Sequence, residues 1–294
     1  MVSPPLYIAG LDIGTTKICC VIAKQEDTGI EIIGMGMVPS PAVRQGQVLN
    51  IEETARSIRK AVETAQRMAG VDIHSVVVGI ADRTVKSGNC TGMISLGREE
   101  IAPEHIRRVL ESARSSITAT DCELLHIVPR EYLVDGLEEI INPLGMSCSR
   151  LEVRAHLVTA GTVSVRNITK ACERAGLQVS SIVLQSIASA DAVLTPDEME
   201  MGVALIDIGG GTTDIAVFKH GLLWYTAELI IAGSHITADL ARHFRIHPTD
   251  AERLKLEYGG CFATRGEVIN QGTRTIHRED FVNEIGRASC RERV

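Results

Sequence analysis

The sequence predicts an α/β protein with two lobes and a small α+β insert within the first lobe. Two observations carry this prediction. A meander of three apolar strands, with a glycine-containing turn after its first strand, opens the chain and recurs in its second half. Helical and buried-strand patterns alternate between the two copies, except over residues 84–160, where the pattern is weaker and mixed. We therefore expect one meander in each lobe.

The two meanders match element by element. Strands are expected at residues 6–13, 18–23 and 30–38 in the first copy, and at 203–208, 215–218 and 222–231 in the second. In each copy an aspartate lies near the end of the first strand, and a turn of small residues follows it. We interpret this match as an internal duplication.

The other segments supply helices and further strands. Asn50, with Glu53 three residues later, is typical of a capped helix start, and apolar residues recur at helical spacing after it. Further helices are expected at 103–117, 163–175, 186–194, 234–244 and 249–258, and further strands at 76–80, 88–97, 124–134, 151–159 and 177–184. The polar, proline-marked segment 195–202 is expected to be a linker.

Composition excludes several classes of protein. The 294 residues are 45% hydrophobic, enough for sizeable cores, and the net charge of -7 with no run of Lys or Arg argues against nucleic-acid binding. Eight cysteines without a Cys-x-x-Cys pair are typical of a cytosolic protein. No apolar run is long enough for a spanning helix, and no secretion signal opens the chain. We expect a soluble cytoplasmic protein.

The turns after the first strand of each meander are the candidate phosphate-binding loops. They read Asp12-Ile-Gly-Thr-Thr16 and Asp207-Ile-Gly-Gly-Gly-Thr-Thr-Asp214. Small residues let a phosphate approach the main chain, and hydroxyl groups add donors. The expected phosphate contacts are Gly14, Thr15, Thr16, Lys17, Gly209, Gly210, Gly211, Thr212 and Thr213. Asp12 and Asp207 would hold Mg²⁺ or its water molecules beside the phosphates.

The element that follows each turn distinguishes this site from other nucleotide-binding folds. A P-loop or a Rossmann fingerprint leads from its glycines into a helix, whereas both turns here lead into strands. A lone Asp-Ile-Gly-Thr-Thr segment is also an ordinary hairpin sequence. Three consecutive glycines are harder to explain without a ligand, because glycine destabilises regular structure by roughly 0.5–1 kcal/mol relative to alanine. Together the two turns favour phosphate binding.

With these two turns, the sequence resembles the superfamily of actin, heat-shock chaperones and sugar kinases. Within that superfamily it resembles the FtsA family of bacterial cell-division proteins. The narrower resemblance rests on segments that reach to about residue 285. These are Gly10-Leu-Asp-Ile-Gly-Thr-Thr-Lys17, Ile32-Ile-Gly-Met-Gly36, His126-Ile-Val-Pro-Arg-Glu-Tyr132, Asn142-Pro-Leu-Gly145, Ile206-Asp-Ile-Gly-Gly-Gly-Thr-Thr-Asp-Ile-Ala216, Asp250-Ala-Glu-Arg-Leu-Lys255 and Tyr258-Gly259.

The resemblance implies an actin-like (ribonuclease H-like) fold with four subdomains. Subdomain 1A would comprise residues 1–83 and residues 161–199, the latter including the linker. The insert, subdomain 1C (an SHS2 domain), would comprise residues 84–160. Part of subdomain 2A would follow over residues 200–232, and part of subdomain 2B over residues 233–285. It also implies ATP with Mg²⁺ between the lobes, self-association into filaments and binding of FtsZ and other division proteins. Members of the family attach to the inner face of the cell membrane at the division site through a C-terminal helix, which we do not expect within these 294 residues.

Further site residues are implied by the same resemblance. Glu252 and Lys255 match a pair that lies near the adenosine in the superfamily, and Gly233 matches the loop entering subdomain 2B. An alternative for Glu252 is a capping box with Thr249. Gln185 lies where relatives keep a water-positioning residue, and Asp207 would assist in catalysis. Whether ATP is hydrolysed slowly or not at all stays open at this stage.

The end of the chain departs from the family pattern. Residues 286–294 form an abrupt basic tail that we expect to be non-native, and a third glycine motif is absent. The second lobe should therefore expose apolar faces, and ATP binding should be weaker than in the family. Two alternative functions remain: a sugar or carboxylate kinase, and a pilus-assembly ATPase. A chaperone-like switch would need a peptide-binding domain, for which the chain has no room.

Overall fold

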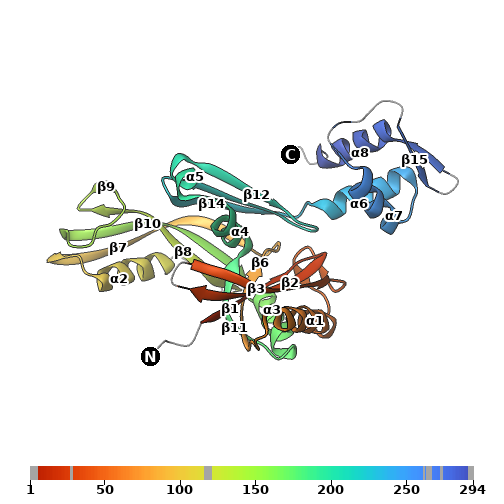
Figure 1. The fold of residues 1–294 in the computed structure, drawn as a ribbon. Coiled ribbons are helices and arrows are strands. Elements are labelled where there is room, and N and C mark those ends of the chain that lie inside the picture. Colours follow the sequence, from red (N-terminus) through yellow and green to blue (C-terminus); the bar gives the residue numbers. More distant parts are fainter. Residues whose placement is uncertain are drawn as a thin grey trace. The chain divides into compact units, whose positions relative to one another are not determined.

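The computed structural model describes residues 6–26, 29–115, 121–260, 262, 267–271 and 274–290. The chain forms two compact units. The first comprises Met1–Asp207 and Thr212–Ile230, and the second comprises Ile208–Gly211 and Ile231–Val294. Figure 1 shows the elements of both units in their order along the chain. Each unit has its own buried apolar cluster.

A five-stranded sheet forms the base of the first unit. Its strands β1 (Tyr7–Ile13), β2 (Lys17–Glu26), β3 (Gly29–Pro39), β6 (Ser75–Ile80) and β11 (Gln178–Leu184) lie in the order β11-β6-β1-β2-β3. β1, β2 and β3 are antiparallel, as the predicted meander requires, whereas β6 and β11 run parallel to β1. A small hairpin of β4 (Val43–Arg44) and β5 (Gln47–Val48), which the sequence patterns did not indicate, follows β3.

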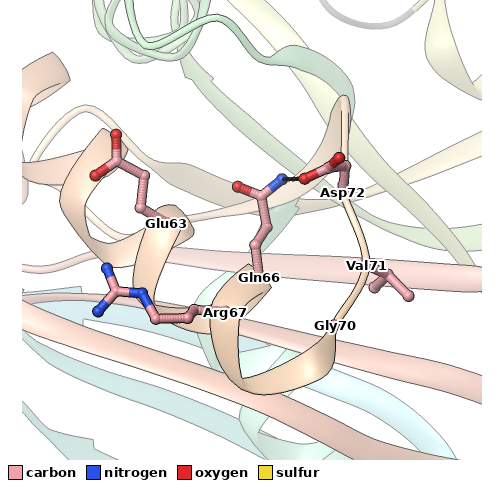
Figure 2. A pocket seen from close by; sticks show the side chains of 6 residues that line it. All are labelled: Glu63, Gln66, Arg67, Gly70, Val71 and Asp72. Carbon is pink, nitrogen blue, oxygen red and sulfur yellow. Dashed lines mark hydrogen bonds between the residues drawn. The ribbon is translucent and has the colours of Figure 1, made fainter.

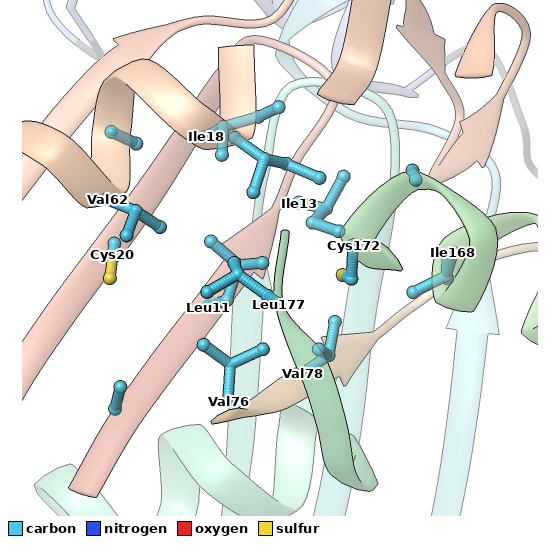
Figure 3. Packing of buried hydrophobic residues seen from close by; sticks show 14 of the residues in the cluster. Leu11, Ile13, Ile18, Cys20, Val62, Val76, Val78, Ile168, Cys172 and Leu177 are labelled. Carbon is cyan, nitrogen blue, oxygen red and sulfur yellow. The ribbon is translucent and has the colours of Figure 1, made fainter. Parts of the chain in front are cut away.

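Two helices pack on one face of this sheet. α1 (Ile51–Ala69) begins at the predicted cap, where the Oδ1 atom of Asn50 accepts a hydrogen bond of 3.0 Å from the backbone N–H of Glu53. α3 is Thr162–Arg174. Figure 3 shows the apolar cluster between helices and sheet, in which Val62 and Ile168 meet the strand residues. Alternate strand residues face this cluster because side chains of a strand alternate between the two faces of a sheet.

Two glycines of β3 allow α1 to approach the sheet closely. A Cβ atom at Gly36 would lie 2.0 Å from the carbonyl oxygen of Ala61, and one at Gly34 would lie 2.4 Å from that of Ala65. No side chain fits at either position without moving the helix. The Gly-Met-Gly segment that contributed to the family resemblance is thus a helix-packing site.

Several large apolar side chains of the two meanders are exposed. On β3, Ile32 is 68% exposed and Met37 is 51% exposed. Ile206 and Ile208 in the second meander are 59% and 68% exposed. Exposed apolar residues were expected for the second meander, whereas those on β3 were not predicted.

The insert is an antiparallel sheet with one helix. Its elements are β7 (Lys86–Glu100), α2 (Pro103–Arg114), β8 (Cys122–Val134), β9 (Leu137–Ile140) and β10 (Ser147–Gly161), with sheet order β7-β10-β8-β9. β9 was missed by the sequence analysis. It follows a tight turn at Asp135 and Gly136, both with positive φ, and the Asp135 carboxylate accepts hydrogen bonds from the backbone of Ser149 and Arg150. The end of the helix expected at 103–117 lies partly outside the described residues.

The second meander consists of β12 (Val203–Ile208), β13 (Thr213–Lys219) and β14 (Leu222–Leu229), as predicted. α4 (Gln185–Val193) and α5 (Pro196–Met201) precede it. Within the expected linker at 195–202, Pro196–Met201 form α5, a helix that the sequence analysis did not predict. Thr195 and Glu198 form a reciprocal capping box, and proline occupies the first turn.

Polar contacts join the insert to β14 within the first unit. His156 on β10 is 1% exposed, and its ring nitrogens lie 2.9 Å from Asn89 Oδ1 and 3.0 Å from Thr226 Oγ1. The Ser87 hydroxyl donates a hydrogen bond of 2.8 Å to the carbonyl of Thr226. A neutral imidazole satisfies both partners of His156, because one nitrogen donates to the amide oxygen and the other accepts from the hydroxyl.

Acidification is expected to weaken this contact. Burial lowers the pKa of His156 below its ordinary value of 6.5, and the positive charge of Arg130 lowers it further. The folded chain thus binds fewer protons than the unfolded chain, so stability should fall as the pH drops below about 6.5. His126 is half-buried, which lowers its pKa, and it contributes in the same direction.

Urea unfolding between pH 7.5 and pH 5 measures this effect. In His156→Gln, which keeps a donor and an acceptor, the loss of stability on acidification should be smaller than in the wild type. His74→Gln, at an exposed histidine, serves as the control. An unchanged pH dependence in His156→Gln would contradict the assignment.

The second unit is mainly helical. α6 (Gly233–Phe244), α7 (Pro248–Tyr258), the hairpin β15 (Val268–Gln271) and β16 (Arg274–His277), and α8 (Arg278–Cys290) surround a cluster that includes Leu240, Leu254 and Phe281. The expected non-native tail over residues 286–294 begins within α8, whose bounds include residues 286–290. These residues continue α8, and Ala288 is buried. Residues 291–294 lie outside the described part.

Candidate functional site

The first glycine turn is shaped by short backbone contacts. The N–H of Gly14 donates a hydrogen bond of 3.0 Å to the carbonyl of Lys17, and a Cβ atom at Gly14 would lie 2.9 Å from that oxygen. The hydroxyl oxygen of Thr15 accepts a hydrogen bond of 3.2 Å from the N–H of Gly46, and the carbonyl of Thr16 accepts one of 3.1 Å from Ser40. Hydrogen bonds from the segment that follows β3 thus fix the conformation of the turn.

One helix hydrogen-bonds the two aspartates that were predicted to bind metal. At the start of α4, Gln185 Nε2 donates to Asp12 Oδ1 at 2.7 Å, and one turn later Ser189 Oγ donates to Asp207 Oδ2 at 2.8 Å. Gln185 and Ser189 face the same side because residues four apart lie above one another on a helix. The structure thus brings together Asp12 and Gln185, two of the predicted residues. The sequence analysis missed Ser189, although its spacing of four residues from Gln185 places both on one side of a helix.

Gly79 makes room for Gln185. It lies on β6 directly beside Asp12 in the parallel register, and a Cβ atom there would come within 2.9 Å of Gln185 Cγ. The sequence analysis did not single out Gly79, because a glycine within a strand pattern gives no indication of which side chain approaches it. Its neighbour becomes known only from the packing of α4.

The charges around the two aspartates fit a hydrated divalent cation. Burial raises the pKa of Asp12 above its usual value, the charge of Lys17 opposes this, and the negative charge of Asp207 adds to it. Within the described residues, each aspartate has one oxygen in a hydrogen bond and the other without a donor. No group of three His, Cys, Asp or Glu residues suitable for a metal occurs in that part of the chain. Mg²⁺ commonly binds one or two carboxylates together with phosphate and water, so this donor set fits it.

A second acidic pair lies on the strands that follow the second turn. Asp214 and Glu228 are direct partners in the register of β13 and β14. Asp214 is 3% exposed, and no described residue outside the pair donates a hydrogen bond to its buried Oδ1 atom or to either carboxyl oxygen of Glu228. Two buried carboxyl groups in this arrangement share a proton, since two adjacent negative charges would repel each other. Burial, with the charge of Asp214, raises the pKa of Glu228 to about 10.

This pair predicts that stability falls as the pH rises. The pKa of Glu228 is raised in the folded chain above its ordinary 4.5, so the folded chain holds a proton that the unfolded chain releases. Its contribution is complete below about pH 4.5 and is lost as the pH approaches 10, at up to about 1.4 kcal/mol per pH unit. In Glu228→Gln, the amide donates to Asp214 at every pH, so this dependence should disappear.

Urea unfolding between pH 7 and pH 9.5 measures the difference between Glu228→Gln and the wild type. Glu63→Gln, at an exposed residue of α1, is the matched control and should follow the wild type. Parallel stability curves for Glu228→Gln and the wild type would show that Glu228 carries no proton at neutral pH.

The glycines of the second turn belong to the second unit and contact the start of α6. The carbonyl of Gly209 accepts a hydrogen bond of 3.1 Å from Gly233 N–H, and that of Gly210 accepts one of 2.9 Å from Ser234 N–H. Thr212 and Thr213 lie in the first unit at the beginning of β13, and Thr212 is buried. Gly211 is buried as well. Gly209, Gly210 and Gly233, three predicted residues, are thus brought together.

Lys255 connects Glu252 with Gly233, two further residues of the predicted site. Its Nζ atom donates to Glu252 Oε2 at 2.7 Å, to Thr237 Oγ1 at 2.9 Å and to the carbonyl of Gly233 at 3.1 Å. Burial opposes ionisation of Glu252, but hydrogen bonds from Lys255 and Thr237 hold its pKa below the usual value. The capping-box alternative for Glu252 is wrong, since α7 begins at Pro248 with His247 as its cap. Thr237 was missed by the sequence analysis.

One surface hollow lies apart from these residues. It is lined by Glu63, Gln66, Arg67, Gly70, Val71 and Asp72 at the end of α1, where Gln66 donates a hydrogen bond of 3.2 Å to Asp72 (Figure 2). It is shallow and polar, and none of the predicted site residues lines it. In the described part of the chain, no helix is both long and apolar enough to cross a membrane.

Comparison with solved structures identifies the fold. The PilM-PilN type IV pilus biogenesis complex has a TM-score of 0.67 at 18% identity, covering 87% of this chain and 70% of that one. MreB5 of Spiroplasma citri bound to ADP has a TM-score of 0.53 at 13% identity, covering 97% and 75%. With the two strand-borne glycine turns, these similarities define an actin-like fold, and the predicted fold class is confirmed.

Family comparison gives the narrower assignment. A model of the SHS2 domain inserted in FtsA matches residues 83–159, and a model of cell division protein FtsA matches residues 204–289. Cell division protein FtsA of Pseudomonas aeruginosa is 42% identical over 257 residues. The chain belongs to the FtsA family of cell-division proteins. The match covers 87% of the chain but 62% of that relative, so the chain spans less than two thirds of its length.

Proposed function

We propose that this chain is the nucleotide-binding part of a cell-division protein that binds Mg·ATP through its two glycine turns. We further propose that it self-associates and tethers FtsZ filaments to the inner face of the cell membrane, where later division proteins are recruited. The observation that carries the nucleotide proposal is the pair of hydrogen bonds by which α4 holds Asp12 and Asp207.

The chemistry of the turns supports nucleotide binding. Gly14 and Thr15 would surround phosphate on one side, and Gly209 to Gly211 would present main-chain N–H groups from the other turn. Bound Mg²⁺ would neutralise phosphate charge, with Asp12 and Asp207 as its protein-side ligands or as acceptors for its water molecules. Lys255, Glu252 and Gly233 would contact the adenosine, and their mutual hydrogen bonds hold them in place for that contact.

Cell division is favoured over pilus assembly by sequence. The relative from Pseudomonas aeruginosa, a cell division protein, is 42% identical to this chain, whereas the similarity to the pilus complex, at 18% identity, concerns the fold alone. A kinase would need a general base beside the transferred phosphoryl group. The sequence of the insert contains no acidic motif typical of such a base.

Two measurements test the proposal separately. Calorimetric titration with ATP should show binding that strengthens when Mg²⁺ is added, and sedimentation with polymerised FtsZ should recover the chain in the pellet. Absence of ATP binding with and without Mg²⁺ would refute the nucleotide assignment. ATP binding without recovery in the pellet would leave the nucleotide site intact but refute the partner assignment for this part of the protein.

A further inference from the structure

α4 presents two hydrogen-bond donors, one turn apart, to the two aspartates of the glycine turns. Gln185 reaches Asp12 at 2.7 Å, and Ser189 reaches Asp207 at 2.8 Å. The opposite side of α4 is fixed in the protein core, because Ala190 is fully buried and packs with Ala216 and Phe218 of β13. The helix therefore has little freedom to move away from the aspartates.

The chemistry of the two donors suits a pair of carboxylates that serve a cation. Both are neutral, so they orient a carboxylate without neutralising its charge. Each engages one oxygen and leaves the other without a donor among the described residues. Neighbouring groups that orient ligands in this way typically change metal affinity by about 10–100-fold when they are removed.

We propose that Ser189 is a positioning residue for Mg·ATP: through its bond to Asp207, and with Gln185 holding Asp12, α4 fixes the two aspartates of the glycine turns relative to each other. This inference rests on the proposed function, because it assigns both carboxylates to the Mg·ATP site. Ser189 itself touches neither phosphate nor metal in this role. Its hydroxyl sets the orientation of Asp207, which in turn meets the cation or its water molecules.

The matched control lies on the same helix. Ser186 is 1% exposed, and its hydroxyl has no hydrogen-bond partner among the described residues. Ser186→Ala therefore removes a buried hydroxyl from α4 without removing a bond. Ser189→Ala removes the bond to Asp207, and Ser189→Thr keeps a hydroxyl at the same place.

ATP titrations with and without Mg²⁺, on the wild type and the three variants, test the proposal. Ser189→Ala should weaken Mg·ATP binding roughly tenfold and Mg-free ATP binding much less. Ser189→Thr should restore most of the affinity, and Ser186→Ala should match the wild type. A merely structural role of Ser189 would weaken both forms of ATP binding equally.

Hydrogen–deuterium exchange without nucleotide provides a second readout. Peptides that cover the end of β12 around Asp207 should exchange faster in Ser189→Ala than in the wild type or Ser186→Ala. The proposal is overturned if the wild type binds Mg·ATP and Ser189→Ala binds it equally well. If the wild type binds no Mg·ATP, the proposed function itself fails, and this inference fails with it.

Discussion

Replacing Gly36 by alanine is expected to destabilise the first unit by about 1–3 kcal/mol or more. The new Cβ atom would lie 2.0 Å from the carbonyl oxygen of Ala61 and 2.9 Å from the backbone N of Ala65. Both atoms belong to the backbone of α1, so no side-chain rotation relieves the clash, and the helix must move away from β3. Forcing extra volume into a packed core typically costs about 1–3 kcal/mol, and more where backbone must shift.

The matched control is Gly10→Ala in the same sheet. A Cβ atom at Gly10 meets nothing within 4 Å, and β1 is the neighbour of β2 in the interior of the sheet. Because alanine is favoured over glycine within strands by roughly 0.5–1 kcal/mol, Gly10→Ala should be neutral or slightly stabilising. Urea midpoints measured by circular dichroism compare the two. Equal midpoints would mean that α1 does not pack on β3 as closely as described.

Replacing Gly210 by aspartate is expected to abolish nucleotide binding, with a loss of affinity on the order of a hundredfold or more. The carbonyl of Gly210 accepts a hydrogen bond from Ser234, which fixes the glycine segment against the start of α6. A carboxylate in this segment would add bulk where phosphate approaches the main chain, and its charge would repel the phosphate. Binding of a fluorescent ATP analogue measures the loss.

The control for charge is Gly88→Asp in the insert. A Cβ atom at Gly88 has no neighbour within 4 Å, so the substitution adds the same carboxylate without a steric conflict. This variant should bind the analogue like the wild type, and circular dichroism should show both variants folded. A folded Gly210→Asp protein that retains the analogue would contradict the assignment of the second turn to phosphate.

The regular elements of the first unit could be predicted from the sequence because their signals are local. The alternation of apolar residues in β1 to β3 and the cap at Asn50 each extend over a few residues. α5 was missed because its proline and polar residues also fit a linker. Thr195, Pro196 and Glu198 are nevertheless typical of a helix start. α8 was not among the expected helices, and its last residues were assigned to a basic tail.

For the candidate site, too, local features could be predicted from the sequence and long-range contacts could not. The sequence by itself determined which residues form the two turns, since Asp12, Asp207 and the glycines follow strands at a fixed spacing that only small residues tolerate. Only the tertiary structure decided how those residues are held. Asp12 and Gln185 are 173 positions apart, and Gly79 and Ser189 acquire their roles from the placement of α4 against β6 and β12. Such contacts depend on how distant elements pack together, and no local pattern of residue types specifies that packing.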